Sequence, residues 1–127
     1  MTTEMTATSV LVDTSVWIQH LKISNSTLVK LLEEGVVCYH PWVVGELSAG
    51  NIKNRKKFLI NLLLLPAAQV VSFEEVFMFI DDHKLFGMGL SFIDIQLLLS
   101  VIKTPGMKIF TRDKKLLEIA KKFAVAI

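Results

Sequence analysis

Short apolar runs alternate along the chain with longer stretches whose apolar positions recur at helical spacing. The strands predicted from this pattern cover residues 9–12, 36–40, 68–73, 107–111 and 124–127. The predicted helices cover residues 14–20, 26–34, 41–50, 53–65, 72–84, 91–102 and 114–123. Strands that alternate with helices form parallel sheets covered on both faces, so the pattern predicts an α/β protein.

Gly and Pro residues separate these segments. One helix is expected to stop at Gly35, another to end before Pro66, and the glycines of GMG at 87–89 break the chain before the next helix. No repeat, low-complexity tract or linker divides the sequence, and 127 residues suffice for one core. A single domain over residues 9–127 is therefore expected, preceded by a flexible N-terminus over residues 1–8.

Apolar residues make up 52% of the chain, which indicates a surface buried against a partner. The most apolar window, 58–73, is shorter than a membrane span and contains Asn61, Pro66 and Gln69, so no transmembrane segment is predicted. The first nine residues lack the basic and apolar segments of a secretory signal, and a cytoplasmic location is expected. Cys38 lies in an apolar run and is predicted to be a buried thiol without a chemical role.

Aspartates follow two of the predicted strands. Asp13 interrupts the run VLVDTSVWI directly after the first strand, and Asp113 follows the fourth. Burying an unpaired carboxylate is costly, so a buried Asp13 requires compensation. Ligands of open parallel sheets lie beyond the carboxyl ends of the strands, where the strand order reverses. If the first and fourth strands are neighbours, the two carboxylates meet above the sheet.

Two more carboxylates interrupt apolar helices. Glu46 is the only charged residue from 41 to 51, and Asp94 is the only one from 87 to 102. This placement predicts two buried helices that each present one carboxylate inward or at the rim.

Helix capping is an alternative role for some of these acids. Ser91 and Asp94 match a capping box, and Asp113 directly precedes a predicted helix. For either residue alone, the capping role and the functional role are about equally supported. The pattern offers no capping role for Asp13 or Glu46.

Four carboxylates from four separate segments indicate one shared site. Clustered carboxylates repel one another, and a divalent cation with oxygen ligands relieves that repulsion. Because neither His nor Cys accompanies them, Mg²⁺ or Mn²⁺ is favoured over Zn²⁺. Such ions activate water and stabilise charge on phosphate, so phosphodiester hydrolysis is the expected reaction. The hydroxyls expected to orient the carboxylates or bind phosphate are Thr14, Ser15 and Thr111, and capping explains Thr14 or Ser15 equally well.

Basic residues are concentrated in two stretches, although the net charge is only +2. These are KNRKK at 53–57 and RDKKLLEIAKK at 112–122. Either stretch suits contact with a phosphate backbone, and either serves equally well as a solvated helix face. The candidates for phosphate contact are Lys53, Arg55, Lys56, Lys57, Arg112, Lys114 and Lys115.

Four segments together resemble the acidic motifs of the PIN-domain family, and in particular the VapC-type toxins of toxin–antitoxin pairs. They are VLVDTSVWI, HPWVVGELSAG, GLSFIDIQLLLS and IFTRDKKL, and they span nearly the whole chain. The resemblance implies that the metal-binding and catalytic acids are Asp13, Glu46, Asp94 and Asp113, with Thr111 as a supporting hydroxyl. It implies a PIN-like three-layer α/β/α fold with a five-stranded parallel sheet. It also implies a Mg²⁺- or Mn²⁺-dependent endoribonuclease that acts on RNA, is inhibited by a cognate antitoxin and forms a homodimer.

Other classes fit less well. A phosphatase of the haloacid-dehalogenase type needs a second aspartate two residues after the first, where this chain has Ser15. A receiver domain needs an acceptor aspartate after the third strand, where this chain has Ser72 and Phe73. The remaining alternative is a PIN-scaffold module that binds RNA or protein without catalysis. The aromatic residues that would line a dimer contact, an antitoxin groove or the core are Trp17, Trp42, Phe77 and Phe79.

Overall fold

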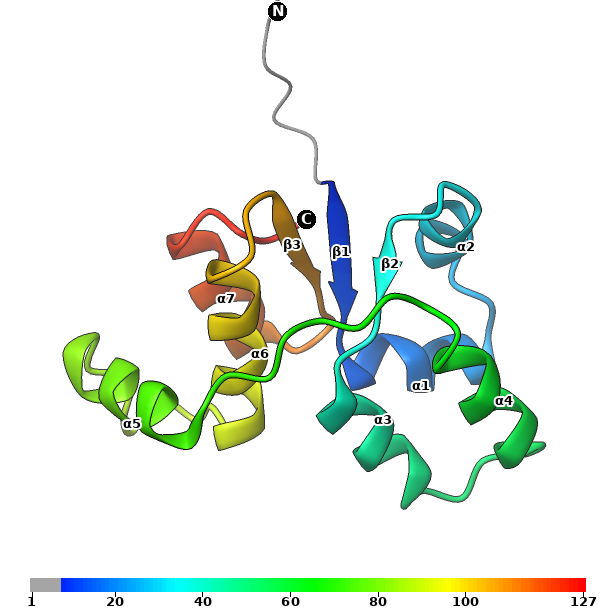
Figure 1. The fold of residues 1–127 in the computed structure, drawn as a ribbon, viewed down its shortest axis with the longest axis horizontal. Coiled ribbons are helices and arrows are strands. Elements are labelled where there is room, and N and C mark those ends of the chain that lie inside the picture. Colours follow the sequence, from blue (N-terminus) through cyan, green and yellow to red (C-terminus); the bar gives the residue numbers. More distant parts are fainter. Residues whose placement is uncertain (1–7) are drawn as a thin grey trace, which may run out of the picture.

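The computed structural model of the chain describes residues 8–127, and a small parallel sheet forms its centre (Figure 1). Val10 in the middle strand lies opposite Val37 on one side and Lys108 on the other, and both pairings are parallel. The strands, in the order β2-β1-β3, are β2 (Val37–Cys38), β1 (Ser9–Val12) and β3 (Met107–Phe110). The first and fourth predicted strands are therefore neighbours, as a shared site at their carboxyl ends requires.

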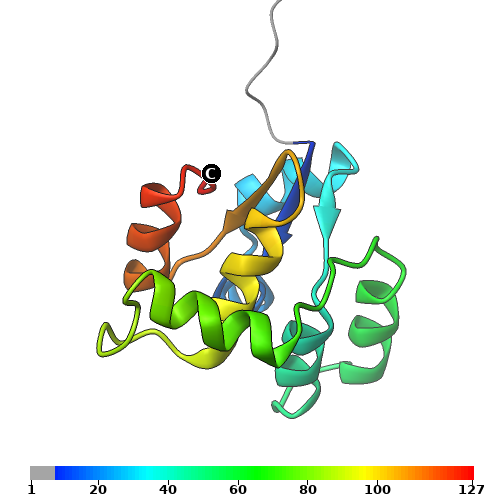
Figure 2. The ribbon, with the colours of Figure 1, turned by 60° about the vertical axis from the view of Figure 1, so that its left-hand side comes forward.

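Seven helices in the described chain surround the sheet and confirm the three-layer α/β/α arrangement. Helix α6 packs against β3, and α5 lies across the outer side of α6 (Figure 2). Each helix overlaps a predicted one, although the ends differ by a few residues. The helices are α1 (Thr14–Lys22), α2 (Ser26–Glu33), α3 (Pro41–Ser48), α4 (Arg55–Leu62), α5 (Phe73–Asp82), α6 (Phe92–Ile102) and α7 (Lys114–Lys122).

The predicted strand at residues 68–73 is wrong, because this segment docks on α6 instead of extending the sheet. The segment reaches the sheet only through an isolated parallel bridge between Tyr39 and Ala67. The backbone of Val71 exchanges two hydrogen bonds with the side-chain amide of Gln96, at 2.7 and 2.9 Å. A side chain of α6 thus satisfies peptide groups that a neighbouring strand would otherwise have paired.

The predicted strand at residues 124–127 is likewise reduced to a single bridge, between Ile109 and Ala126. Ala124 adopts the left-handed conformation, with φ of 59°, so extended backbone begins only after it. The Ile127 N–H then donates to the Ile109 carbonyl at 3.1 Å. The expected five-stranded sheet is therefore three strands with one bridge at each edge.

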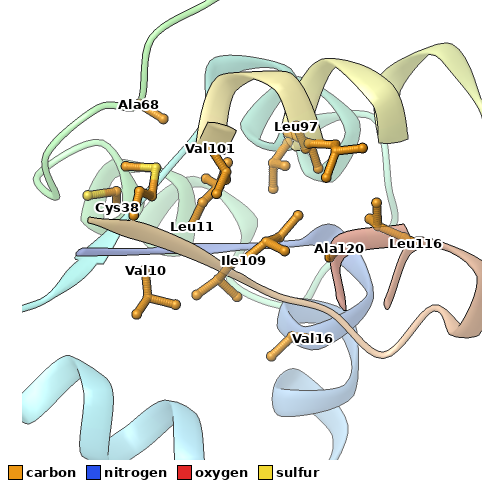
Figure 3. Packing of buried hydrophobic residues seen from close by; sticks show 14 of the residues in the cluster. Val10, Leu11, Val16, Cys38, Ala68, Leu97, Val101, Ile109, Leu116 and Ala120 are labelled. Atoms are coloured by element: carbon orange, nitrogen blue, oxygen red, sulfur yellow. The ribbon is translucent and has the colours of Figure 1, made fainter. Parts of the chain in front are cut away.

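Helix α6 is the centre of the hydrophobic core. Every residue from Ile95 to Val101 is buried, which explains why this helix is apolar nearly all round. Figure 3 shows Leu97 and Val101 on one side of the strands, and Val16 of α1 on the other. Both faces of the sheet are therefore covered, as expected for parallel strands.

The described chain begins at Thr8, whose backbone N–H donates to the Gly106 carbonyl at 3.0 Å. The remaining residues of the expected flexible N-terminus (1–8), residues 1–7, lie outside the described residues. Within residues 8–127, no helix combines the length and apolar character needed to cross a membrane. Cys38 is buried, as predicted.

Candidate active site at the carboxyl ends of the strands

Asp13 directly follows β1 and is only 6% exposed. Its carboxylate accepts hydrogen bonds from the Thr14 backbone N–H at 2.8 Å, the Ser15 hydroxyl at 2.9 Å and the Thr111 hydroxyl at 2.7 Å. Hydrogen bonds to an ionised carboxylate are strong, so these three offset much of the cost of burial. The expectation that Asp13 has no capping role is wrong, because it is the N-cap residue of α1.

The hydroxyls of Ser15 and Thr111 tie the ends of β1 and β3 together. Thr111 donates to Asp13 and accepts the backbone N–H of Asp113 at 3.0 Å. Ser15 also donates to Asp13, and it accepts the backbone N–H of Arg112 at 3.0 Å. The two hydroxyls therefore orient the segment that carries Asp113 relative to the buried Asp13.

Helix capping is confirmed for both Asp94 and Asp113. The Asp94 carboxylate accepts the Ser91 backbone N–H at 2.9 Å, while the Asp94 backbone N–H donates to the Ser91 hydroxyl at 3.0 Å. Asp113 is the N-cap of α7, and its Oδ1 accepts the Leu116 N–H at 2.9 Å. Each of these caps engages one carboxylate oxygen. A capping role and a ligand role are therefore compatible for both residues.

The pKa of Asp94 is raised above the ordinary value of an aspartate. Burial is the main cause, the hydrogen bonds with Ser91 oppose it, and the negative charges of Asp13 and Asp113 add to it. The three carboxylates thus lie within electrostatic reach of one another. A cation among them would lower the pKa of Asp94, because it would favour the charged form.

Glu46 reaches the same edge of the sheet from α3. Its Oε1 accepts a hydrogen bond from the Thr14 hydroxyl at 2.7 Å, and Thr14 is next to Asp13 in the chain. The expectation of a buried helix is wrong for α3, in which only Val43 and Leu47 are buried and Glu46 itself is exposed. The helix is short and packs on α1 and α4 rather than beneath the sheet.

The four acids share an edge of the molecule, although they do not form a closed coordination shell. Within residues 8–127, no group of three or more His, Cys, Asp or Glu side chains stands close enough to hold a metal ion directly. The donors nevertheless fit Mg²⁺, which keeps several water ligands and binds through one or two carboxylates together with substrate phosphates. Glu46 and Asp113 are exposed, and each has one carboxylate oxygen held by a hydrogen bond, to Thr14 and Leu116 respectively.

One basic cluster flanks Asp113 at the start of α7, where Arg112, Lys114 and Lys115 are exposed. The Lys115 side chain lies against Gly89 in the loop before α6. It is so close that a methyl group at Gly89 would collide with it. Gly89 has φ of +79° in addition, a conformation that favours glycine. The absence of a side chain there lets the Lys115 ammonium lie against this loop.

The second basic cluster lies around the start of α4, on the opposite side of the strands from α7 (Figure 1). Its members Lys53, Arg55, Lys56 and Lys57 are exposed. The Arg55 guanidinium donates to the Ser48 carbonyl at 2.7 Å, which ties this cluster to the end of α3. The described contacts are compatible with phosphate binding and equally with solvated helix faces.

A pocket of about 470 Å³ separates this second cluster from Glu46. It lies between α1, α3 and residues 50–54. Its apolar walls come from Ile18, Leu21, Leu47 and Ile52, and its polar rim includes Glu46 and Lys53.

A buried polar network between α3 and α6 was not predicted. His40 is the N-cap of α3, and its Nδ1 accepts the Trp42 backbone N–H at 3.0 Å, which leaves Nε2–H to donate to Gln96 Oε1 at 3.2 Å. Burial lowers the pKa of His40, and the hydrogen bond with Gln96 opposes this shift. The available signals were a histidine directly before Pro41 and a lone amide in the apolar run IDIQLLL.

The fold agrees with the comparisons to known proteins. The family model of the PIN domain matches residues 10–122, so the chain belongs to the PIN-domain family. Within that family it is of the VapC type: Ribonuclease VapC32 of Mycobacterium tuberculosis, found in two strains, is 40% identical over 118 residues, which cover 93% of this chain and 95% of that protein. The crystal structure of PAE2754 from Pyrobaculum aerophilum matches with a TM-score of 0.64 over 98% of this chain and 91% of the other, at 17% identity. That match supports the fold alone.

Proposed function

We propose that this chain is a Mg²⁺- or Mn²⁺-dependent endoribonuclease that hydrolyses RNA as the toxin of a VapBC-type toxin–antitoxin pair. The observation that carries the proposal is that Asp13 and Asp113 follow the neighbouring strands β1 and β3 and are linked through the Thr111 hydroxyl, with Asp94 of α6 near enough for their charges to raise its pKa. Its 40% identity to a protein named ribonuclease VapC32 supports the same activity. No observation favours the alternative of a PIN-scaffold module that binds RNA or protein without catalysis.

The proposed ligands and catalytic acids are Asp13, Glu46, Asp94 and Asp113. These residues would hold a divalent ion, which when bound would supply activation of a water molecule and neutralisation of charge on the phosphate. Ser15 and Thr111 hold Asp13, and Thr14 holds Glu46, so the hydroxyls orient the carboxylates. The exposed edge beyond them leaves room for an RNA strand to approach.

RNA binding is assigned to the two basic clusters on either side of the acids. Arg112, Lys114 and Lys115 lie next to Asp113, and their charges suit contact with phosphates close to the cleaved bond. The cluster of Lys53, Arg55, Lys56 and Lys57 extends that contact beyond α3. Such contacts orient the backbone and carry no base sequence, so they leave the choice of RNA to shape.

A cognate antitoxin is the proposed protein partner. The pocket beside Glu46 supports this assignment, because its apolar walls suit an apolar segment of a partner and its rim offers both a carboxylate, Glu46, and an ammonium group, Lys53, for polar contacts. Occupation of this pocket would place the antitoxin against one of the acids and block the approach of RNA. A cytoplasmic location is proposed with it, since the proposed RNA substrate is found there.

A second copy of the chain is the proposed partner of α5. Phe73, Phe77 and Met78 of this helix are 60%, 56% and 61% exposed, and the first two rings stack at 5.7 Å. Of the other aromatic residues considered for a partner surface, Trp17 is in the core and Phe79 is partly buried. The expected result is a dimer by sedimentation, which Phe77→Ser converts to monomer; a monomeric parent protein at high micromolar concentration contradicts it.

Cleavage of structured RNA by the purified chain tests the proposed activity. Cleavage is expected with Mn²⁺ and lost with excess chelator, and sequencing of the fragment ends identifies the cleaved bond. Asp113→Asn is the matched control for a contaminating nuclease, because asparagine is also a good N-cap and the fold is retained. Undiminished cleavage by this variant, or cleavage in chelator, overturns the proposal.

A further inference from the structure

The buried pair of His40 and Gln96 connects the two helices that carry Glu46 and Asp94. His40 directly precedes α3, and Gln96 lies two residues after Asp94 in α6. Residues two apart on a helix point in nearly opposite directions, so Gln96 faces away from Asp94 and toward the start of α3. The pair therefore joins the two helices behind the site.

Both polar atoms of the Gln96 amide make hydrogen bonds at this junction between His40 and α6. Its Oε1 accepts from His40 Nε2 at 3.2 Å and from the Val71 N–H at 2.7 Å, and its Nε2 donates to the Val71 carbonyl at 2.9 Å. His40 and Gln96 are both 0% exposed. Movement of α3 away from α6 would leave buried polar atoms unpaired, so the junction resists it.

Other contacts between the starts of the two helices are few. The rings of Trp42 and Phe92 lie 6.2 Å apart, and the remaining surface of α3 packs on α1 and α4. Glu46 is five residues beyond Pro41, or about 7.5 Å along the helix axis. A tilt of about 10° at the junction would move Glu46 by about 1.3 Å, and a displacement of that size is enough to lower a rate by about 100-fold.

We infer that His40 and Gln96 are positioning residues that set the separation of Glu46 and Asp94 required to bind the divalent ion. The inference rests on the proposed function, because it takes these two acids as ligands. It gives the buried amide a role beyond satisfying the backbone of Val71. Ser100 provides the comparison: it also lies on α6 and donates to the Gln69 carbonyl at 2.7 Å, but it makes no hydrogen bond to α3 or its cap.

Thermal melts at increasing Mn²⁺ concentration test the inference on three variants. His40→Asn keeps a side-chain acceptor for the cap of α3 and keeps the Gln96–Val71 bonds, but it is too short to reach Gln96. Gln96→Met removes all three bonds of the amide. Ser100→Ala is the matched control. The Mn²⁺ concentration for half-maximal stabilisation is expected to rise about threefold to tenfold in His40→Asn and Gln96→Met, which is less than the loss expected for a residue that hydrogen-bonds a metal ligand directly. It is expected to stay unchanged in Ser100→Ala.

A double-variant cycle with Glu46→Gln separates positioning from general loosening. If the junction acts through Glu46, His40→Asn produces no additional change in Mn²⁺ affinity once Glu46 is Gln. In cleavage assays, His40→Asn is expected to lower kcat and leave KM for RNA unchanged.

Each remaining outcome contradicts a specific part of the inference. Equal Mn²⁺ responses of His40→Asn and Ser100→Ala overturn the positioning role, even if Gln96→Met does not fold. An undiminished effect of His40→Asn in the Glu46→Gln background also overturns it. A parent protein that neither binds Mn²⁺ nor cleaves RNA instead overturns the proposed function, and this inference with it.

Discussion

Helices α3 and α6 each bring one acid to the candidate site, but they hold it in different ways. Asp94 lies in the first turn of a helix that is buried from Ile95 to Val101, and a capping box with Ser91 orients its carboxylate. Glu46 lies in the last turn of an eight-residue helix that is buried at only two positions, and its carboxylate is held by Thr14 from another helix.

The difference separates local from tertiary positioning. A carboxylate oriented by the backbone of its own helix keeps its place as long as that helix forms. One held through another element depends on how its helix docks. Substitutions around Asp94 are therefore expected to separate function from stability, whereas those around Glu46 are expected to change metal binding through geometry.

The largest expected effect is that of Asp94→Asn. The amide oxygen still accepts the Ser91 N–H, while the charge is lost, so RNA cleavage should fall by about two to four orders of magnitude. The raised pKa of Asp94 means that its charged form is disfavoured in the fold, and stability in chelator at neutral pH should hold or increase. Melts in chelator and in Mn²⁺, together with a cleavage assay, measure both.

Ser91→Ala is the matched control for that experiment. It removes the cap and keeps the carboxylate, so it should cost about 1 kcal/mol of stability while much of the cleavage activity remains. A destabilised but active Asp94→Asn protein would show that Asp94 is only a capping residue.

The second prediction concerns the hydrogen bond from the Thr14 hydroxyl that orients Glu46. Thr14→Val removes the hydroxyl donor and keeps the shape, so the affinity for Mn²⁺ should fall about 10-fold, within the range for residues that orient a ligand. The free energy of unfolding in chelator should change little, because the Thr14–Glu46 hydrogen bond is exposed. Calorimetric Mn²⁺ titration measures the first quantity and urea unfolding the second. Unchanged Mn²⁺ affinity would remove Glu46 from the site.

The third prediction asks on which side of the acids RNA passes. Lys114→Ala with Lys115→Ala should weaken RNA binding several-fold, and each lost phosphate contact should reduce the salt slope by about one. Lys56→Ala with Lys57→Ala tests the basic cluster at the start of α4 in the same assay. Lys121→Ala with Lys122→Ala, at the far end of α7, is the control for lost charge alone. A salt slope of RNA binding equal to that of this control would show that the tested pair of lysines faces solvent and makes no phosphate contact.

The smallest expected effect is a pH dependence of stability at His40. Burial lowers the pKa of His40 in the fold, so its contribution is fully present above the unfolded pKa of about 6.5 and is lost as pH falls toward the folded pKa. Urea unfolding at pH 7.5 and 5.5, in chelator, should show a smaller loss for His40→Asn than for the parent protein. An equal loss in both would show that His40 does not titrate in this range.

The sequence predicted features that depend on local pattern, and it failed where tertiary contacts decide. The alternation of strands and helices and the caps at Asp94 and Asp113 follow from periodicity and capping preferences, whereas the pairing of β1 with β3 was only a condition for a shared site until the strand order showed it. The strand predicted at 68–73 failed because Gln96 satisfies the Val71 backbone, a contact 25 residues away that no local pattern reveals. The cap at Asp13 was missed although a helix was predicted from residue 14, because Asp13 was interpreted only as a residue that ends the first strand.

The pairing of β1 with β3 also determines when the candidate site forms during synthesis. Ser9 lies opposite Met107, and the Thr111 hydroxyl that holds Asp13 comes from 98 residues further along the chain. Contacts of such large sequence separation form slowly, and at about 5–20 residues per second the last acid emerges many seconds after the first. A nascent chain therefore carries Asp13 and Glu46 without an assembled candidate site, and the proposed antitoxin has no activity to inhibit until the segment with Thr111 and Asp113 has been synthesised.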